Sequence, residues 1–344
     1  DNVILETSKC INCGSCMREC PVVLLEGQAR FSGPRTAAVD SPRFMTELGA
    51  LAGDITMCTT CWRCEEVCPA RIRLPEAILD IRRRIFSAGE PLQGHRRIIE
   101  NVDRHRLSVE PAGEVPRGVK ESGQVLYFPG CISRERVPSI YLATIGVLEK
   151  VGADFGIPYD WVCCGAPLEK IGDRERMDRL VEENRRRFEG FQKVVTSCPG
   201  CTTQMLHHYG IQPMHTIEYL YEEIGLENLP FRARKVRVAL HHPCHLARTI
   251  GPHAIDYAYE ILQAIPGVEV MEMEDSEVCC GGGGAVVAGH PQVALALARE
   301  KMRNFGESGA DLLLAPCPFC KLNLDRVGGE VEEFVTFLDG CMKR

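Results

Sequence analysis

Eighteen of the nineteen cysteines in this chain of 344 residues fall into motifs, and every motif occurs twice. The first motif, C-x2-C-x2-C-x3-C-P, begins at Cys10 and again at Cys58. The second joins a single cysteine, an adjacent pair and a C-P-x-C run, and it begins at Cys131 and again at Cys244. Because thiolates are ligands for soft metals, cysteines at such fixed spacings indicate a fold built around metal centres.

The first motif has the spacing that holds cubane 4Fe–4S clusters in bacterial-type ferredoxins. In such a pair of runs, the fourth cysteine of each run binds the cluster of the other run. We therefore predict two cubanes, one on Cys10, Cys13, Cys16 and Cys68 and one on Cys58, Cys61, Cys64 and Cys20. Two cubanes in one domain indicate electron transfer, but the sequence does not tell which cubane lies nearer a reaction site.

Composition limits the partners and the compartment. The net charge of −7 argues against nucleic acid as a partner. No apolar run approaches the roughly 20 residues that span a bilayer, so any membrane association would go through a partner subunit. Clustered C-x2-C thiols without a signal peptide indicate a reducing compartment. We expect a cytoplasmic protein, peripheral on the inner membrane face at most.

The chain is predicted to be α+β overall and to divide into four segments. Residues 1–90 form a helical ferredoxin-like domain, 91–123 a linker, and 124–235 and 236–344 two copies of an α/β unit with parallel sheets. In each copy the cysteines follow strand ends, where ligands bind in open α/β sheets. Strands are expected at 125–128, 193–196, 236–240 and 311–314, and helices at 42–51, 75–87, 139–151, 174–191, 255–264 and 292–305.

Each copy of the second motif offers five thiolates. Adjacent cysteines diverge, so they do not readily bind one tetrahedral metal, but they can bind two neighbouring irons of a larger cluster. Gly165 and Gly281, which follow the pairs, allow a tight turn against inorganic sulfide. The alternatives are a structural zinc ion, which needs only four thiolates, and disulfides within the pairs. The fifth thiolate favours the larger cluster.

At this point the residues resemble a known family. Phe128-Pro129-Gly130-Cys131, Cys163-Cys164-Gly165-Ala166-Pro167, Cys279-Cys280-Gly281 and Cys317-Pro318-Phe319-Cys320 resemble the duplicated CCG domain in the B subunit of heterodisulfide reductase. With a ferredoxin domain ahead of it, the chain is similar to the D subunit of that enzyme. The B subunit of thiol:fumarate reductase and the iron–sulfur subunits of glycolate and lactate oxidases look similar over the same span.

The resemblance implies a noncubane 4Fe–4S cluster on each five-cysteine set. The first set is Cys131, Cys163, Cys164, Cys198 and Cys201, and the second is Cys244, Cys279, Cys280, Cys317 and Cys320. These cysteines are then catalytic, because the coenzyme M–coenzyme B disulfide is reduced between the two clusters. Both sets are complete, which favours the branch of the family that reduces disulfides.

The same resemblance implies a multi-subunit complex. The electron donor would be a flavoprotein or cytochrome b subunit, because no dinucleotide-binding fingerprint places flavin or nicotinamide on this chain. The alternative function is an electron relay that serves a flavin-dependent lactate or glycolate dehydrogenase, or a thiol:fumarate reductase.

Four residues outside the cysteine motifs are candidates for a role in the reaction or in substrate binding. His245 is the candidate proton donor, with a helix cap as the alternative, and His241 and His242 are weaker candidates. Lys321 either attracts the anionic ends of the coenzymes or begins a solvated helix.

Other features have a structural interpretation. The glycines at 281–284 are expected to permit close backbone approach rather than to bind phosphate, because the Gly-Lys-Ser/Thr ending is absent. Trp62 is expected to shield a cubane or to face a docking partner. Cys341 is expected to be a free thiol. The arginine runs at 82–84 and 185–187 are expected on solvated helix faces, with a docking patch as the alternative.

Overall fold

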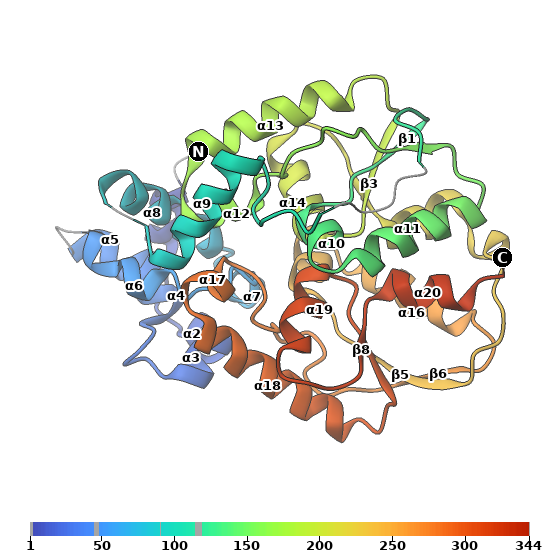
Figure 1. The fold of residues 1–344 in the computed structure, drawn as a ribbon. Helices are drawn as coiled ribbons and strands as arrows, with labels where there is room; N and C mark the ends of the chain where they lie inside the picture. Colours follow the sequence, from blue (N-terminus) through green and yellow to red (C-terminus); the bar gives the residue numbers. More distant parts are fainter. Residues whose placement is uncertain (1–2, 45–47, 90, 114–118, 344) are drawn as a thin grey trace.

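A computed structural model describes residues 3–44, 48–89, 91–113 and 119–343. The chain forms a helical N-terminal part and two α/β units, coloured green to yellow and orange to red in Figure 1. The predicted fold class is confirmed by this arrangement. Within the described ranges, no helix has the length and apolar content needed to cross a membrane.

Each α/β unit contains a four-stranded parallel sheet with the same strand order. The first sheet has the order β2-β1-β3-β4 and the second β6-β5-β7-β8. The first comprises β1 (Val125–Tyr127), β2 (Phe155–Gly156), β3 (Lys193–Thr196) and β4 (Met214–His215). The second comprises β5 (Val236–Leu240), β6 (Val268–Met271), β7 (Leu312–Leu314) and β8 (Val331–Glu332). The sequence repeat is therefore also a structural repeat.

The strand order determines where the cysteines gather. In each sheet the connections lead outward in opposite directions from the two central strands, which makes the junction between them a topological switch point. Cys131 and Cys198 follow the central strands β1 and β3, and Cys244 and Cys317 follow β5 and β7. In each α/β unit, the five-cysteine motif therefore begins and ends at the ligand-binding edge of a doubly wound sheet.

The longer predicted helices are confirmed. They are α8 (Leu74–Ala88), α11 (Pro138–Lys150), α13 (Arg174–Phe188), α16 (His253–Gln263) and α18 (Pro291–Glu307). Helix α13 ends three residues earlier than predicted, because Glu189 is extended and Gly190 has a φ of 91°. The predicted helix at 42–51 is described as α5 (Ser41–Phe44) and a 3-10 turn (Leu48–Leu51), and residues 45–47 lie outside the described part.

The predicted linker is wrong in one respect, because it contains the helix α9 (Gln93–His105). This helix buries His95 and Val102 and packs against α12 (Ala166–Ile171) and α17 (Val286–Gly289), one from each α/β unit. The buried and half-buried positions of α9, His95, Ile98, Ile99 and Val102, do follow the helical period, but the Pro and Gly residues on either side of the helix favour an irregular segment. The segment is a structural bridge between the two units rather than an irregular connection.

The two α/β units pack on each other reciprocally. In the first unit, α14 (Pro199–His208) contacts the π-helix η6 (His245–Ile250) of the second. In the second unit, α19 (Pro318–Asp325) contacts α10 (Cys131–Glu135) of the first. Each contact joins the helix that carries one C-P-x-C run to the helix that follows the single cysteine of the other unit. This packing turns the two five-cysteine sets toward each other.

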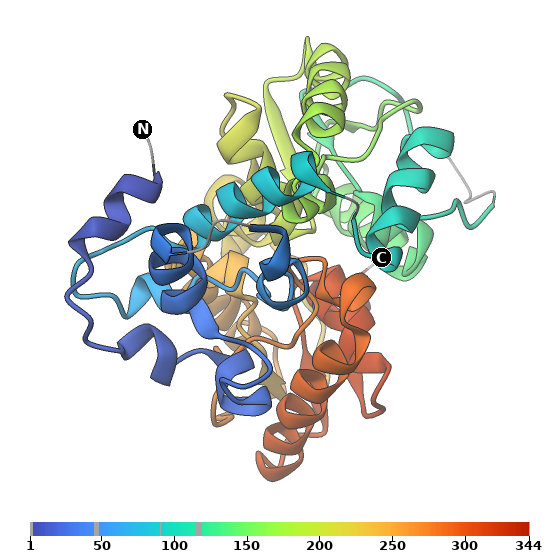
Figure 2. The same cartoon turned by 90° about the vertical axis from the view of Figure 1, so that its left-hand side faces the viewer.

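The N-terminal part lies against both units, as Figure 2 shows. Helix α8 contacts α12 of the first unit, and α3 (Pro21–Glu26) contacts α18 of the second. Arg82 of α8 is 2% exposed, and its guanidinium donates hydrogen bonds to four backbone carbonyls, those of Ile55, Cys58, Lys170 and Gly284. The prediction of a solvated face is therefore wrong for Arg82. A buried cation needs such acceptors, and they come from all three parts of the molecule.

Candidate metal centres

The cysteines of the second predicted cubane lie together. Cys20, Cys58, Cys61 and Cys64 line one small cavity, together with Trp62. Cys20 belongs to the first ferredoxin run and the other three to the second, which is the crossed arrangement expected of paired runs. Trp62 is 8% exposed, and this burial supports its predicted role as a shield.

The cysteines of the first predicted cubane are also neighbours. Burial and the nearby thiols of Cys10, Cys68 and Cys13 raise the pKa of Cys16 to about 11. Cys68, from the second run, therefore lies with the first three cysteines of the first run. Cys13 is exposed, so this group reaches the surface of the protein.

All five cysteines of the first set line a single pocket, Cys131, Cys163, Cys164, Cys198 and Cys201. The sulfur atoms of Cys164 and Cys201 are 3.4 Å apart. Hydrogen bonds from Cys163 and Cys201 lower the pKa of Cys164 to about 6. Five convergent thiols with at least one easily ionised member suit a metal cluster, whereas a single disulfide would use only two of them.

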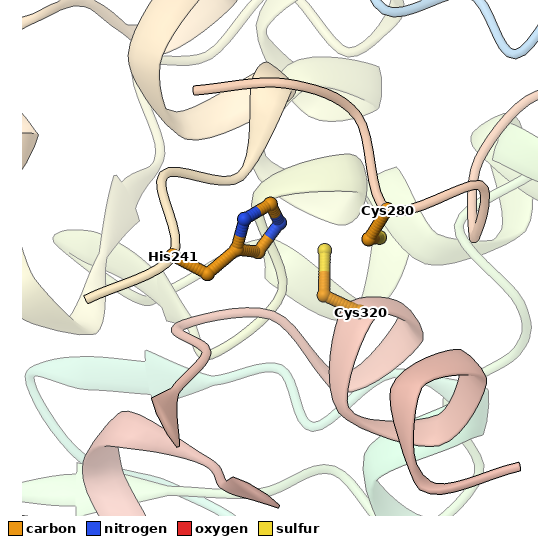
Figure 3. A group of neighbouring side chains, drawn as sticks. All are labelled: His241, Cys280 and Cys320. Atoms are coloured by element: carbon orange, nitrogen blue, oxygen red, sulfur yellow. The ribbon is translucent and has the colours of Figure 1, made fainter. Parts of the chain in front are cut away.

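All five cysteines of the second set line a larger cavity of about 390 Å³, Cys244, Cys279, Cys280, Cys317 and Cys320. His241 joins them, because one of its ring nitrogens and the sulfurs of Cys280 and Cys320 lie within 4.8 Å of one another (Figure 3). Burial, and then the charge of Lys301, lowers the pKa of His241 well below its usual range.

The two sets meet across the boundary between the α/β units. The thiols of Cys198 and Cys317 interact directly, and this hydrogen bond helps to lower the pKa of Cys198 and raises that of Cys317. Phe319 borders both the large cavity and the smaller pocket of the first set. A molecule in the large cavity therefore lies beside the second set and one aromatic ring away from the first.

The second predicted cubane is the one that approaches the five-cysteine sets. Cys61, Cys244 and Cys279 form one buried cluster. A hydrogen bond with Cys279, followed by burial, raises the pKa of Cys61 well above its usual range. The sequence left the order of the two cubanes open, and the structure puts the Cys58 run on the inside and Cys13 at the surface.

Cationic and amide groups line the large cavity. Arg136 follows α10 and Arg326 follows α19, so each α/β unit contributes one exposed arginine. Gln204 of α14 is 2% exposed, and neither atom of its amide group has a partner within the described residues. Sequence reasoning missed these three residues, which lie next to the motifs but belong to none of them.

His245, the predicted proton donor, lines the large cavity with its Nδ1 3.6 Å from the sulfur of Cys244. Burial lowers its pKa to about 3, so the ring is neutral near pH 7. His242 is turned away, because its Nε2 lies 2.9 Å from the hydroxyl of Tyr259. Lys321 pairs with Asp325 on the same helix, which favours the solvated-helix interpretation.

The glycine run brings backbones together as expected. A Cβ atom on Gly284 would lie 2.4 Å from the carbonyl oxygen of Cys58, so the run packs on the second ferredoxin motif. Cys341 is a free, fully buried thiol in α20 (Phe334–Cys341). Arg185 and Arg186 are exposed and Arg187 is half-buried on α13, as expected of a solvated face.

These residues fit iron–sulfur clusters. Three of the four predicted cysteine sets each line a cavity, and the thiols of each set converge on it. Two buried hydrogen-bond donors beside the second cubane set, Thr60 Oγ1 and Trp62 Nε1, have no partner within the described residues. Donors of this kind can bond to cluster sulfur, which accounts for their burial.

Comparisons with known proteins agree with this interpretation. Residues 125–206 and 238–325 match the CCG cysteine-rich domain, and residues 6–72 match a 4Fe-4S dicluster domain. The B subunit of the fumarate reductase (CoM/CoB) of Methanothermobacter marburgensis is 32% identical, over 92% of this chain and 67% of that protein. The chain thus spans about two thirds of the length of that relative.

Two further relatives have different names. The D subunit of the dihydromethanophenazine:CoB–CoM heterodisulfide reductase of Methanosarcina mazei is 28% identical, over 93% of this chain and 89% of that protein. Lactate utilization protein A of Macrococcus caseolyticus is 25% identical, over 59% of this chain and 88% of that protein. Among solved structures, a hypothetical protein from Helicobacter pylori has a TM-score of 0.61 at 10% identity, covering 100% of this chain and 75% of that one, and shares the fold alone.

These matches support an iron–sulfur protein with an electron-transfer role, and the fumarate reductase and heterodisulfide reductase relatives are subunits of oxidoreductases. The dicluster domain comes first and the cysteine-rich domain follows twice, in the order in which the structure places the helical part and the two α/β units. The chain therefore belongs to the family of CCG-domain iron–sulfur proteins that includes the D subunit of heterodisulfide reductase and the B subunit of CoM/CoB fumarate reductase.

Proposed function

We propose that this chain is the catalytic iron–sulfur subunit that reduces the coenzyme M–coenzyme B heterodisulfide to two thiols. The reaction consumes two electrons and two protons for each S–S bond broken. Two noncubane 4Fe–4S clusters, one on each five-cysteine set, would supply the electrons at the disulfide. The two cubanes would deliver electrons singly from a flavoprotein or cytochrome b subunit of the same complex.

One observation carries this proposal. The complete second set opens on a cavity of about 390 Å³, and Cys317 of that set interacts with Cys198 of the equally complete first set. A subunit that only relays electrons has no need for a cavity beside its innermost centre. A disulfide that must receive two electrons is served by two centres close to it, and here the second set lines the cavity while Phe319 separates the first set from it.

The cavity wall suits an anionic, extended substrate. Arg136 and Arg326 stand on opposite units, and no acidic side chain pairs with Arg136 among the described residues. The two arginines are therefore available to hold the anionic ends of the two coenzymes. Gln204 offers an unpartnered amide within the same cavity, which can donate to or accept from the substrate.

Apolar residues of the cavity exclude water from the disulfide. Ile98, Val109 and Phe319 lie on its wall, and a low-dielectric site strengthens the interaction between the substrate and the charged groups around it. His245 reaches the same space and remains the proposed proton donor to a leaving thiolate, but its neutral ring must first take up a proton before it can give one. Its ring nitrogen that does not face Cys244 is the atom that would carry this proton.

An anaerobic assay with a reduced viologen dye as donor and the heterodisulfide as acceptor tests the proposal. We expect rapid dye oxidation by protein that contains about sixteen iron atoms per chain, four for each of four clusters. The variant Cys198→Ser should lose the activity, and Cys341→Ala, which removes a buried thiol outside every set, should keep it. Full iron content without dye oxidation would refute a catalytic role.

The second candidate function is an electron relay for a flavin-dependent 2-hydroxy-acid dehydrogenase. The similarity to lactate utilization protein A favours it. This relay would accept electrons from a flavoprotein partner that oxidises lactate or glycolate. Rapid reduction of the iron–sulfur centres by such a partner, with no response to the heterodisulfide, would select this function.

A further inference from the structure

The two α/β units differ in one buried side chain on the helix behind the cysteine pair. In the first unit Asn184 of α13 stands four residues after a buried leucine and four before a buried phenylalanine. Lys301 of α18 has the same two spacings in the second unit. The glycine after each cysteine pair packs on the residue seven positions earlier in the helix, Met177 or Ala294. Lys301 therefore occupies the place of Asn184 in the repeat.

The two side chains differ in charge. The neutral amide of Asn184 donates hydrogen bonds to the carbonyl oxygens of Val162 and Cys163. The ammonium of Lys301, whose side chain is 2% exposed, donates to the carbonyl oxygen of Asp275. Burial lowers the pKa of Lys301 to about 8, so the charged form still prevails near pH 7.

Lys301 lies beside the second five-cysteine set. Lys301, Cys279 and Cys61 line one cavity of about 310 Å³, on the side of the second set that meets the second predicted cubane. Among cysteines, Cys280 and then Cys279 do most to favour the charged form of Lys301. In the described part of the chain, the pocket of the first set has no charged side chain on its wall.

Other charges around this cavity compensate for Lys301 only in part. Its acidic side chains are exposed or half-buried, so solvent screens them more than it screens a buried ammonium. Arg248 also lines the cavity, but it forms ion pairs with Glu66 and Glu277. Lys301 is therefore the cation whose field reaches the second set with the least compensation.

We propose that Lys301 raises the reduction potential of the cluster on the second set above that of the cluster on the first. Each added electron makes a cluster more negative, so a nearby buried cation stabilises the reduced form more than the oxidised form. The first electron to arrive would then stay at the set that lines the substrate cavity. The inference rests on the proposed function, and it assigns to Lys301 a role that acts through the cluster.

Potentiometric titration of the anaerobic protein, followed by electron paramagnetic resonance, tests this role. Cys164→Ser and Cys280→Ser, which change matching positions of the two repeats, assign one reduction step to each set. In the wild type the second set should be reduced before the first. Lys301→Gln keeps a hydrogen-bond donor but removes the charge. It should shift the distribution of the first electron at least tenfold toward the first set, or about 59 mV for a one-electron step.

Two further variants serve as controls. Lys301→Arg keeps the charge and should keep the order of the wild type. Arg299→Gln removes an exposed cation from the same helix and should leave all potentials unchanged. If Lys301→Gln binds less iron than the wild type, Lys301→Met replaces it, because methionine also lacks the charge and fills a similar space.

Equal potentials of the two sets in the wild type, or reduction of the first set before the second, would overturn the inference. An unchanged potential of the second set in an uncharged variant with full iron content would overturn it as well. Heterodisulfide reduction by a protein with equal potentials would refute the inference and leave the proposed function in place. The expected order of potentials without heterodisulfide reduction would do the reverse.

Discussion

Cys61 of the second ferredoxin motif lies against Cys279 of the second five-cysteine set, and the two thiols share one hydrogen bond in a buried cluster. They are 218 positions apart in the chain, so only the packing of the helical part on the second α/β unit brings them together. In the proposed electron path, this contact makes the second predicted cubane the last donor before the cavity.

Loss of Cys61 is therefore expected to interrupt electron delivery. Cys61→Ser should lower viologen-driven turnover by at least about 10-fold, or about 1.4 kcal/mol in activation free energy. Cys13→Ser, at the exposed outer cubane, should lower it less, because a small dye can still reduce the inner centre. Iron analysis and turnover of both variants check the order, with Cys341→Ala as the control. A larger loss in Cys13→Ser would contradict it.

Arg82 is expected to be a major determinant of stability. Arg82→Met leaves four buried carbonyl oxygens without their donor, and we expect a loss of roughly 3–5 kcal/mol in the free energy of unfolding. Arg84→Met, which removes an exposed arginine paired with Asp80, should cost less than about 1 kcal/mol. Thermal unfolding under argon at a fixed scan rate compares the two variants. Equal unfolding temperatures of the two variants would show that the hydrogen bonds of the buried guanidinium do not stabilise the packing of the three parts.

The two arginines of the cavity are expected to act on substrate binding. Arg136→Gln and Arg326→Gln should each raise KM for the heterodisulfide by roughly 3- to 10-fold, since each removes one exposed charge contact. The value of kcat should change little, because neither residue touches a cysteine set. Steady-state kinetics measure both constants, and Arg186→Gln on the exposed side of α13 is the control. An unchanged KM would exclude the arginines as anchors.

Glu333 is expected to make stability depend on pH. It caps α20 by accepting hydrogen bonds from the backbone N–H groups of Val335 and Thr336, and burial raises its pKa to about 8. The folded pKa thus lies above the value of 4.5 for a free glutamate, so folding favours the protonated form. The contribution of Glu333 to stability should be greatest below about pH 4.5 and should fall as the pH rises to about 8.

Unfolding temperatures measured between pH 6 and pH 8 test this dependence. Glu333→Gln keeps an oxygen acceptor for the cap but cannot ionise, so its unfolding temperature should fall less over that range. Glu330→Gln, at an exposed position close by, should behave as the wild type does. If the wild type and Glu333→Gln gave the same slope, another group would be responsible for it.

Much of the fold could be predicted because local patterns determine it. The central strands β1, β3, β5 and β7 are apolar runs that end at cysteine motifs, and such runs are visible in the sequence. The edge strands β2, β4 and β8 have two residues each, too few to show any alternation. Helix α9 keeps the helical spacing at Ile98, Ile99 and Val102, but the Pro and Gly residues on either side of it favour an irregular segment.

The contacts between distant segments could not be predicted. Arg82 stands in a run of three arginines, and nothing local distinguishes the one that is buried from the two that are not. Cys61 and Cys279 are close because the helical part packs on the second α/β unit. The spacing of cysteines along the chain gives no information on that packing. Lys301 could have been found by placing the two repeats side by side, since it stands where the first repeat has Asn184.

The reciprocal packing of the two α/β units has the symmetry of a two-fold dimer whose halves have been joined in one chain. In a homodimer, one gene dictates both sides of the shared interface, so any new side chain arises on both sides at once. Fusion removes that restriction, and Asn184 on one side can coexist with Lys301 on the other. A covalently joined pair is thus free to specialise each half for a different end of an unsymmetrical molecule.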